Sequence, residues 1–148
     1  TSGGAGTMGY GVPAAIGAQV GNPDSLVVCI SGDASVLMNI QELATATQHR
    51  TPVKVILCNN QHMGMVRQWQ ELIHDGRYSH SYNDSIPDFV ALARAFGWEA
   101  ATVSDPSELE AALQECRRPV FPGCAGSGTG KLLPHDAGRL RAPAGHVV

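Results

Sequence analysis

Hydrophobic and polar positions along the chain predict alternating strands and helices. Two short apolar runs, residues 26–30 and 53–57, stop abruptly at small and oxygen-bearing residues, which is typical of buried parallel strands that end at the edge of a sheet. Between the runs, residues 35–50 carry apolar side chains at helical spacing. This part of the chain therefore predicts a strand, a helix and a second parallel strand, joined by a right-handed crossover.

The remaining pattern predicts further helices and strands. We expect helices at residues 12–20, 64–74, 87–96 and 109–116, and strands at residues 98–103 and from residue 119. Pro87 fits the first turn of its helix, and Gly97 fits the end of that helix. Because strands alternate with helices, the fold class is predicted to be α/β, a parallel sheet flanked by helices.

Composition and charge narrow the class of protein. The chain has 148 residues, of which 43% are hydrophobic, and a formal net charge of −3. These values predict one domain with a core, and they show no basic excess of the kind that binds nucleic acid. No apolar run approaches the roughly 18 residues that span a membrane. The four cysteines have no paired spacing, which favours free thiols and a cytoplasmic location.

Oxygen-bearing side chains follow both central strands, Asp33 after the first and Asn60 after the second. The carboxyl ends of neighbouring parallel strands meet at one edge of a sheet, where ligands bind. One carboxylate, one carboxamide and a main-chain carbonyl after Asn60 provide about half of an octahedral magnesium shell, which phosphate and water complete. Gly32 permits close approach, and free N–H groups at Ala34 and Ser35 favour an anion. The pattern predicts a magnesium-bridged diphosphate.

Taken singly, each motif also has a purely structural interpretation, in which Asp33 caps a helix and Asn59-Asn60 forms a turn. Taken together, Gly32-Asp33-Ala34-Ser35 and Asn59-Asn60 resemble the signature of the thiamine-diphosphate enzyme family, which includes acetohydroxyacid synthases, pyruvate decarboxylases and pyruvate oxidases. Within that family, residues 1–11 and 59–69 are similar to the acetohydroxyacid (acetolactate) synthase catalytic subunit. Ala34 departs from the pattern, because many members have Gly there. The resemblance extends to about Phe121.

The resemblance implies roles for individual residues. Asp33, Asn60 and the main-chain carbonyl of His62 would hold Mg²⁺, and Met65, Val66 and Trp69 would line the substrate channel. The implied cofactor contacts are Gly6, Met8, Gly32, Asp33, Ala34, Ser35, Asn60, Met63, Gly64 and Met65. The Gly6 carbonyl would accept a hydrogen bond from the aminopyrimidine, and Met8 would support the bent cofactor. Met8 has ordinary core packing as its alternative interpretation. On spacing alone, the apolar stripe that contains Met65 is more typical of core residues than of a substrate channel.

The resemblance implies a thiamine-diphosphate-dependent acetolactate synthase, which decarboxylates pyruvate and joins the two-carbon unit to pyruvate or 2-ketobutyrate in branched-chain amino acid biosynthesis. The activating glutamate and the FAD site of the family lie in other domains. Because the chain opens with Thr1 inside a glycine-rich turn, we expect an N-terminally truncated fragment. Such a fragment has no catalytic residue and is expected to be inactive alone.

The implied partners are a homodimer or larger assembly with the active site at a subunit interface, and a regulatory subunit, with neither nucleic acid nor membrane. In a eukaryote the location would be the plastid or the mitochondrion. Two alternatives remain open. The chain could belong to another thiamine-diphosphate 2-ketoacid decarboxylase or acetyltransferase, or it could be a non-catalytic remnant of such a domain.

The chain from residue 122 onward has a different character. It is rich in glycine, proline and basic side chains and has no apolar period, so we expect residues 1–121 to form the domain and residues 122–148 to be disordered or loosely attached. Back-translation of residues 130–148 with synonymous codons, read one base later, can give a sequence similar to the Pro-Met-containing C-terminus of acetohydroxyacid synthases. The sequence therefore predicts a frameshift near Phe121 or Pro122.

Overall fold

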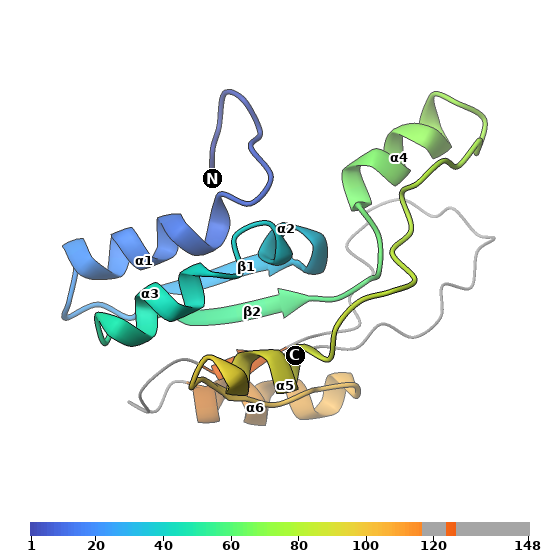
Figure 1. Cartoon of the computed structure of the whole chain (residues 1–148). Helices are drawn as coiled ribbons and strands as arrows, with labels where there is room; N and C mark the ends of the chain where they lie inside the picture. The colour runs from blue at the N-terminus through green and yellow to red at the C-terminus, as the bar shows by residue number, and fades with distance from the viewer. Residues whose placement is uncertain (117–123, 127–148) are drawn as a thin grey trace.

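A parallel sheet forms the centre of the structure, a computed structural model that describes residues 1–116 and 124–126 (Figure 1). Within the described residues the strand order is β1-β2-β4-β3. The strands are β1 (Val28–Gly32), β2 (Lys54–Cys58), β3 (Glu99–Ala100) and β4 (Cys124–Gly126). All three neighbouring pairs are parallel. The predicted α/β fold class is confirmed.

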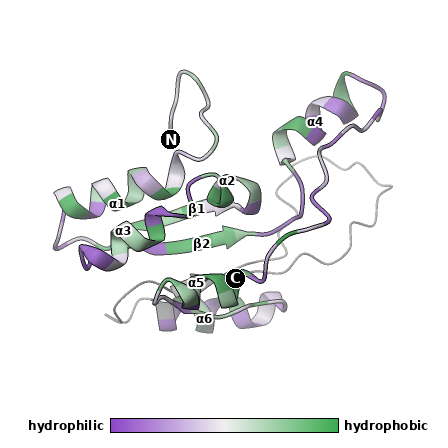
Figure 2. Cartoon of the chain, in the orientation of Figure 1, coloured by the Kyte–Doolittle hydropathy of each residue, from purple (hydrophilic) through white to green (hydrophobic). Residues whose placement is uncertain are grey.

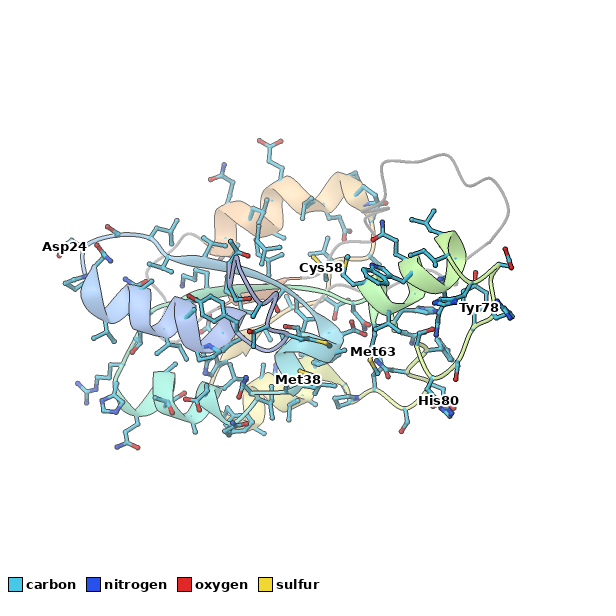
Figure 3. The ribbon with its side chains drawn as sticks, turned by 90° about the horizontal axis from the view of Figure 1, so that it is seen from above. Asp24, Met38, Cys58, Met63, Tyr78 and His80 are labelled. Carbon is cyan, nitrogen blue, oxygen red and sulfur yellow. The ribbon has the colours of Figure 1, made fainter. Side chains whose placement is uncertain are left out.

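Helices lie on both faces of the sheet, as the view from above shows (Figure 3). One face carries α1 (Gly11–Gly21), α2 (Asp33–Leu37), α3 (Glu42–Gln48) and α5 (Phe89–Ala95). The other face carries α6 (Leu109–Cys116), which follows the short 3₁₀ helix η1 (Pro106–Glu108). The remaining helix, α4 (Gly64–Leu72), stands away from the sheet beyond the carboxyl end of β2 (Figure 1).

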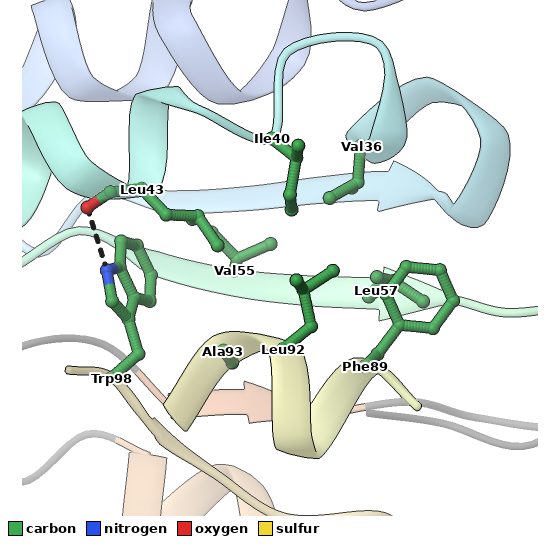
Figure 4. Close-up of a pocket in the computed structure, with 9 residues that line it drawn as sticks. All are labelled: Val36, Ile40, Leu43, Val55, Leu57, Phe89, Leu92, Ala93 and Trp98. Carbon is green, nitrogen blue, oxygen red and sulfur yellow. Dashed lines mark hydrogen bonds between the residues drawn. The ribbon is translucent and has the colours of Figure 1, made fainter. Parts of the chain in front are cut away.

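The main core lies between β2 and the helices α3 and α5, because successive strand side chains point to opposite faces. Val55 and Leu57 point toward α5, where Phe89 is buried (Figure 4). The space among these side chains is only about 20 Å³, so the core is nearly filled. On the other face, Val28 and Ile56 line a groove against α6.

The prediction of a single helix over residues 35–50 is wrong, because this segment forms two helices, α2 and α3. The break lies at Asn39, whose side-chain amide donates to the Gly9 carbonyl at 2.8 Å. The main-chain bonds around it, Asn39 N to Val36 O and Glu42 N to Asn39 O, have the three-residue spacing of turns. A long-range contact has therefore replaced a continuous helix.

Two other boundaries differ from the sequence prediction. The helix expected from Pro87 begins at Phe89, because Asp88 is its N-cap and accepts a hydrogen bond from Ala91 N at 3.0 Å. The strand expected over residues 98–103 is confined to Glu99–Ala100. Trp98, expected in that strand, is buried instead beneath α3.

The prediction for the last part of the chain differs from the structure at one place. Residues 122–148 were expected to form no regular structure, but Cys124–Gly126 form β4 and pair with both β2 and β3. The other residues of this segment, the strand expected from residue 119 and the predicted frameshift position lie outside the described residues. Among the helices of the described residues, none combines the length and the hydropathy that a membrane crossing requires.

Candidate active site

The two predicted motifs meet at the carboxyl end of the sheet. Gly32, the last residue of β1, pairs with Cys58, the last residue of β2, so Asp33 and the segment after Cys58 leave the sheet side by side. The main-chain N–H of Gln61 donates to the Asp33 carboxyl. Burial raises the pKa of the Cys58 thiol, and the charge of Asp33 adds to that rise. The topology therefore brings the two strand ends together, as the sequence predicted.

Asp33 is the buried acid of this edge. Only 1% of its surface is exposed, and its Oδ2 atom has no hydrogen-bond partner. Burial raises the pKa of the carboxyl, and the N–H groups of Ala34 and Gln61 oppose that rise. The Ala34 N–H, which the sequence suggested would be free for an anion, is thus directed at Asp33 itself. The chain holds a carboxyl here whose charged form lacks full compensation.

The segment after β2 forms a tight turn whose side chains bind its own backbone. Asn59 Oδ1 accepts from Gln61 N at 3.2 Å, and Asn60 Oδ1 accepts from His62 N at 3.0 Å. Gln61 has a φ of 59°, a left-handed conformation that is uncommon for a side chain of this kind. The turn expected on structural grounds is therefore present. It leaves Asn60 exposed, next in the chain to Gln61, whose N–H reaches Asp33.

A divalent cation fits the chemistry of these groups. Within residues 1–116 and 124–126, no three His, Cys, Asp or Glu side chains gather as a metal site. The donors predicted here are instead one carboxylate, one carboxamide and one main-chain carbonyl, a set that suits magnesium. The unpartnered Asp33 Oδ2 would supply the negative oxygen of such a set. Asn60 Oδ1 has a second lone pair besides the one that His62 N–H occupies.

The N-terminal glycine-rich turn is fastened to α2 through Gly9. Gly9 N donates to Ser35 Oγ at 3.0 Å, and Gly9 O accepts from Asn39 at 2.8 Å. Its φ is +89°, and a Cβ atom at this position would lie 2.7 Å from Asn39 Nδ2, so only glycine fits. Neither Gly9 nor Asn39 was predicted as a site residue from the sequence, although the run of glycines was the available signal.

Gly6 and Met8 belong to the same turn. Gly6 has a φ of +60° and open space where a side chain would be, and its N–H donates to Ser2 O. Met8 is exposed, so its alternative interpretation as a core residue is wrong for this chain. Both residues thus remain accessible to a ligand above α2.

Helix α4 presents its apolar side to solvent. Met65 is 68% exposed and Trp69 59% exposed, and Val66, Leu72 and Ile73 are exposed as well. In contrast, Arg67 and Glu71 form an ion pair at 2.8 Å that is largely covered. The hydropathy colouring shows both kinds of residue on this helix (Figure 2). The core interpretation of the stripe is therefore wrong here, because the polar side of α4 faces its own chain.

Met63 and Gly64 connect this helix to the turn. Met63 N donates to Ser81 O at 2.8 Å, and Gly64 begins α4 close to the Asn60 side chain. Seen from above, Met63 and Met38 lie at the carboxyl end of the strands, far from Asp24 (Figure 3). The N-terminal turn and α4 stand apart in Figure 1. The predicted site residues thus lie at one end of the sheet, and those of the N-terminal turn are separate from those of α4.

Comparison with known proteins identifies relatives of this chain. The family model described as "Thiamine pyrophosphate enzyme, C-terminal TPP binding domain" matches residues 1–123. The chain is 54% identical to the acetolactate synthase large subunit of Haemophilus influenzae over 114 residues, covering 77% of this chain and 20% of that protein. It is 52% identical to the acetolactate synthase isozyme 3 large subunit of Escherichia coli over 119 residues, covering 80% and 21%.

A solved structure has the same fold. The thiamine diphosphate-dependent 4-hydroxybenzoylformate decarboxylase of Rhodococcus jostii matches with a TM-score of 0.73 and 30% identity, covering 81% of this chain and 22% of that one. The chain thus spans about one fifth of the length of the curated relatives. The family match covers most of the sequence and includes both strand-end motifs. The chain therefore belongs to the thiamine pyrophosphate enzyme family and carries its C-terminal thiamine pyrophosphate-binding domain.

Proposed function

We propose that this chain supplies the magnesium- and diphosphate-binding domain of an acetolactate synthase. The observation that carries the proposal is the buried Asp33 carboxyl, whose Oδ2 atom is unpartnered beside the turn that contains Asn60. A buried charge without a partner is costly, and a divalent cation would offset that cost. The identity of 54% and 52% to acetolactate synthase large subunits supports the choice of activity.

In this proposal, Asp33, Asn60 and the main-chain carbonyl of His62 hold Mg²⁺. Asp33 contributes the negative charge, and the other two contribute neutral oxygens. Gly32 and Ser35 would flank the diphosphate. A Cβ atom at Gly32 would meet only the Cys58 carbonyl oxygen, at 3.9 Å, so the Gly32 backbone is open to close approach. Phosphate and water oxygens complete the shell of the ion. The cation thereby anchors the cofactor to the sheet.

The other cofactor and substrate contacts come from the two segments that rise above the sheet. Gly6 and Met8 on the N-terminal turn would contact the cofactor, as would Met63, Gly64 and Met65 where α4 begins. Val66 and Trp69 continue the exposed face of α4 and form the wall of the substrate channel with Met65. An exposed apolar face of this kind also fits a subunit interface, which supports a homodimer or larger assembly.

Bound thiamine diphosphate supplies the decarboxylation of pyruvate and the transfer of the two-carbon unit to a second 2-ketoacid. This chain contributes binding and orientation, and no catalytic residue. The activating glutamate and FAD would belong to other domains, so the chain alone is expected to be inactive. A regulatory subunit and a cytoplasmic location, or a plastid or mitochondrial one in a eukaryote, complete the proposal.

The cofactor site can be tested by titrating the 148-residue chain with Mn²⁺ and thiamine diphosphate, with the free Mn²⁺ followed by electron paramagnetic resonance. We expect saturable binding that Asp33→Asn abolishes. Asp75→Asn is the matched control, because Asp75 is 92% exposed on a distant loop. Equal binding by Asp33→Asn and the wild type would refute the metal site.

The activity needs the longer protein that contains this sequence. With pyruvate as substrate, acetolactate is the expected product. Acetaldehyde as the main product would favour a 2-ketoacid decarboxylase, the activity named for the solved structure that matches this fold. Failure to bind the cofactor would favour a non-catalytic remnant. The predicted frameshift is tested separately, by reading the encoding DNA in all three frames beyond the codon for Phe121.

A further inference from the structure

A chain of hydrogen bonds connects the predicted metal-binding turn to α4. Its centre is His62, whose Nδ1 atom lies 2.6 Å from Asn60 O and whose Nε2 atom lies 2.9 Å from Arg67 Nη1. Arg67 Nε donates to Glu71 Oε1 at 2.8 Å. Arg67 therefore contacts His62 of the turn through one nitrogen and Glu71 of its own helix through another.

The chemistry of arginine decides the direction of these bonds. A guanidinium group has donors and no acceptor, so Arg67 Nη1 donates and His62 Nε2 accepts. The proton of the ring must then lie on Nδ1, which donates to Asn60 O. Arg67 thus selects one of the two neutral forms of His62, the form that can hold the Asn60 carbonyl.

Arg67 is itself held firmly in place. Glu71 Oε1 also accepts a hydrogen bond from Tyr78 at 2.9 Å, and the Arg67 guanidinium lies 5.6 Å from the Tyr78 ring centroid. This arrangement lowers the pKa of Glu71, with the bond from Arg67 as the largest cause. Figure 3 shows Tyr78 beside α4. The loop after α4 therefore braces the side chain that orients His62.

The turn has an uncommon backbone conformation, and hydrogen bonds hold it at several points besides the His62 ring. Gln61 has a positive φ, and its N–H donates both to Asn59 Oδ1 and to the Asp33 carboxyl. His62 N donates to Asn60 Oδ1. Side chains that hold metal-binding groups in position contribute strongly to metal affinity.

We propose that Arg67 is a positioning residue for the metal-binding turn, which it orients by fixing the hydrogen-bonding form of His62. This inference rests on the proposed function, because the turn is taken to hold the cation. In the proposed site Arg67 supplies no ligand to the ion, and its own contacts are to His62, Glu71 and Tyr78. Its effect passes through His62 to the Asn60 main chain, and it links the metal site to the helix that carries Trp69.

The first measurement is the ring form of His62, read from ¹⁵N NMR shifts of the 148-residue chain at mildly alkaline pH and assigned with His62→Gln. The wild type is expected to carry the proton on Nδ1. Arg67→Ala is expected to lose this preference. Arg67→Lys is expected to keep it, because an ammonium group also donates without accepting. A wild-type ring protonated on Nε2 would overturn the proposal.

The second measurement is Mn²⁺ affinity in the presence of thiamine diphosphate. Arg67→Ala is expected to weaken binding about tenfold, and Arg67→Lys to recover much of the loss. Arg77→Ala is the matched control, since Arg77 lies 75% exposed on the following loop, and it is expected to bind as the wild type does.

The outcomes separate this inference from the proposed function. No Mn²⁺ binding by the wild type refutes the proposed function, and the inference with it. Normal wild-type binding with equal affinity in Arg67→Ala refutes the inference alone. A change of ring form in Arg67→Ala without a change in affinity also refutes it, because Arg67 would then brace α4 without serving the metal site.

Discussion

The core beneath Trp98 and the carboxyl edge of the sheet have opposite characters. In the core, the Trp98 indole N–H donates to Leu43 O and Thr47 Oγ1, both at 3.1 Å, and apolar side chains fill the remaining space. At the edge, Asp33 has a buried oxygen without a partner, and α4 turns apolar side chains toward solvent. The core stabilises the fold. The edge lowers the stability of the chain, because it holds polar and apolar groups that only a ligand or another chain would satisfy.

The largest expected effect lies in the core. Phe89→Ala removes a buried ring from the contact between α5 and β2 and is expected to lower the free energy of unfolding by about 3–5 kcal/mol. Urea unfolding followed by circular dichroism measures the change. A loss as small as that of an exposed residue would show that this core does not support the domain.

Asp33→Asn tests the edge and is expected to act in the opposite direction. It removes a buried charge while an amide oxygen still accepts from the Ala34 and Gln61 N–H groups. Because an unpaired amide costs less to bury than an unpaired carboxylate, the metal-free chain should gain unfolding free energy, on the order of 1 kcal/mol. The same urea experiment measures the gain. Destabilisation would show that the carboxylate is compensated already, and the contrast between the regions would fail.

The pH dependence of stability sharpens the same point. The pKa of Asp33 is raised in the folded chain, so the folded state holds its proton to higher pH than the unfolded state does. Between the ordinary value of 3.8 and the raised pKa, the metal-free chain should lose stability as pH rises, and the loss should level off above the raised pKa. Subtracting the profile of Asp33→Asn isolates this contribution. A difference profile without slope would contradict the prediction.

The smallest expected effect is on α4. Trp69 is 59% exposed, so Trp69→Ala should change the unfolding free energy of the chain by less than about 0.5 kcal/mol. Thermal and urea unfolding of the two proteins measure the difference. A large destabilisation would mean that α4 packs against its own chain, and that its apolar side is no open surface.

The sequence allowed the edge to be predicted more fully than the helices around it. Apolar runs that stop near Asp33 and Asn60 were sufficient, because the carboxyl ends of neighbouring parallel strands lie at the same edge of a sheet. The sequence did not predict which side of α4 faces solvent, because an apolar stripe shows that a helix has an apolar face but not what covers that face. The Arg67 to His62 bond was missed for a similar reason, since it depends on how α4 leaves the turn.

Other misses came from contacts between distant residues. Asn39 interrupts a good helical pattern because it binds Gly9, which lies thirty residues earlier in the chain. Cys124–Gly126 were predicted to lack structure because small residues show no apolar period, yet they pair with β2 on one side and with β3 on the other. Local patterns predicted the elements, and tertiary contacts decided their ends.

The attachment of Gly9 to Ser35 and Asn39 has a consequence for ligand affinity. Because both the N–H and the carbonyl of Gly9 are tied to the segment that begins at Asp33, the spacing between the glycine-rich turn and the strand-end motif is set before anything binds. A ligand long enough to touch both would immobilise little additional chain. The entropic penalty of its capture is thereby reduced in advance.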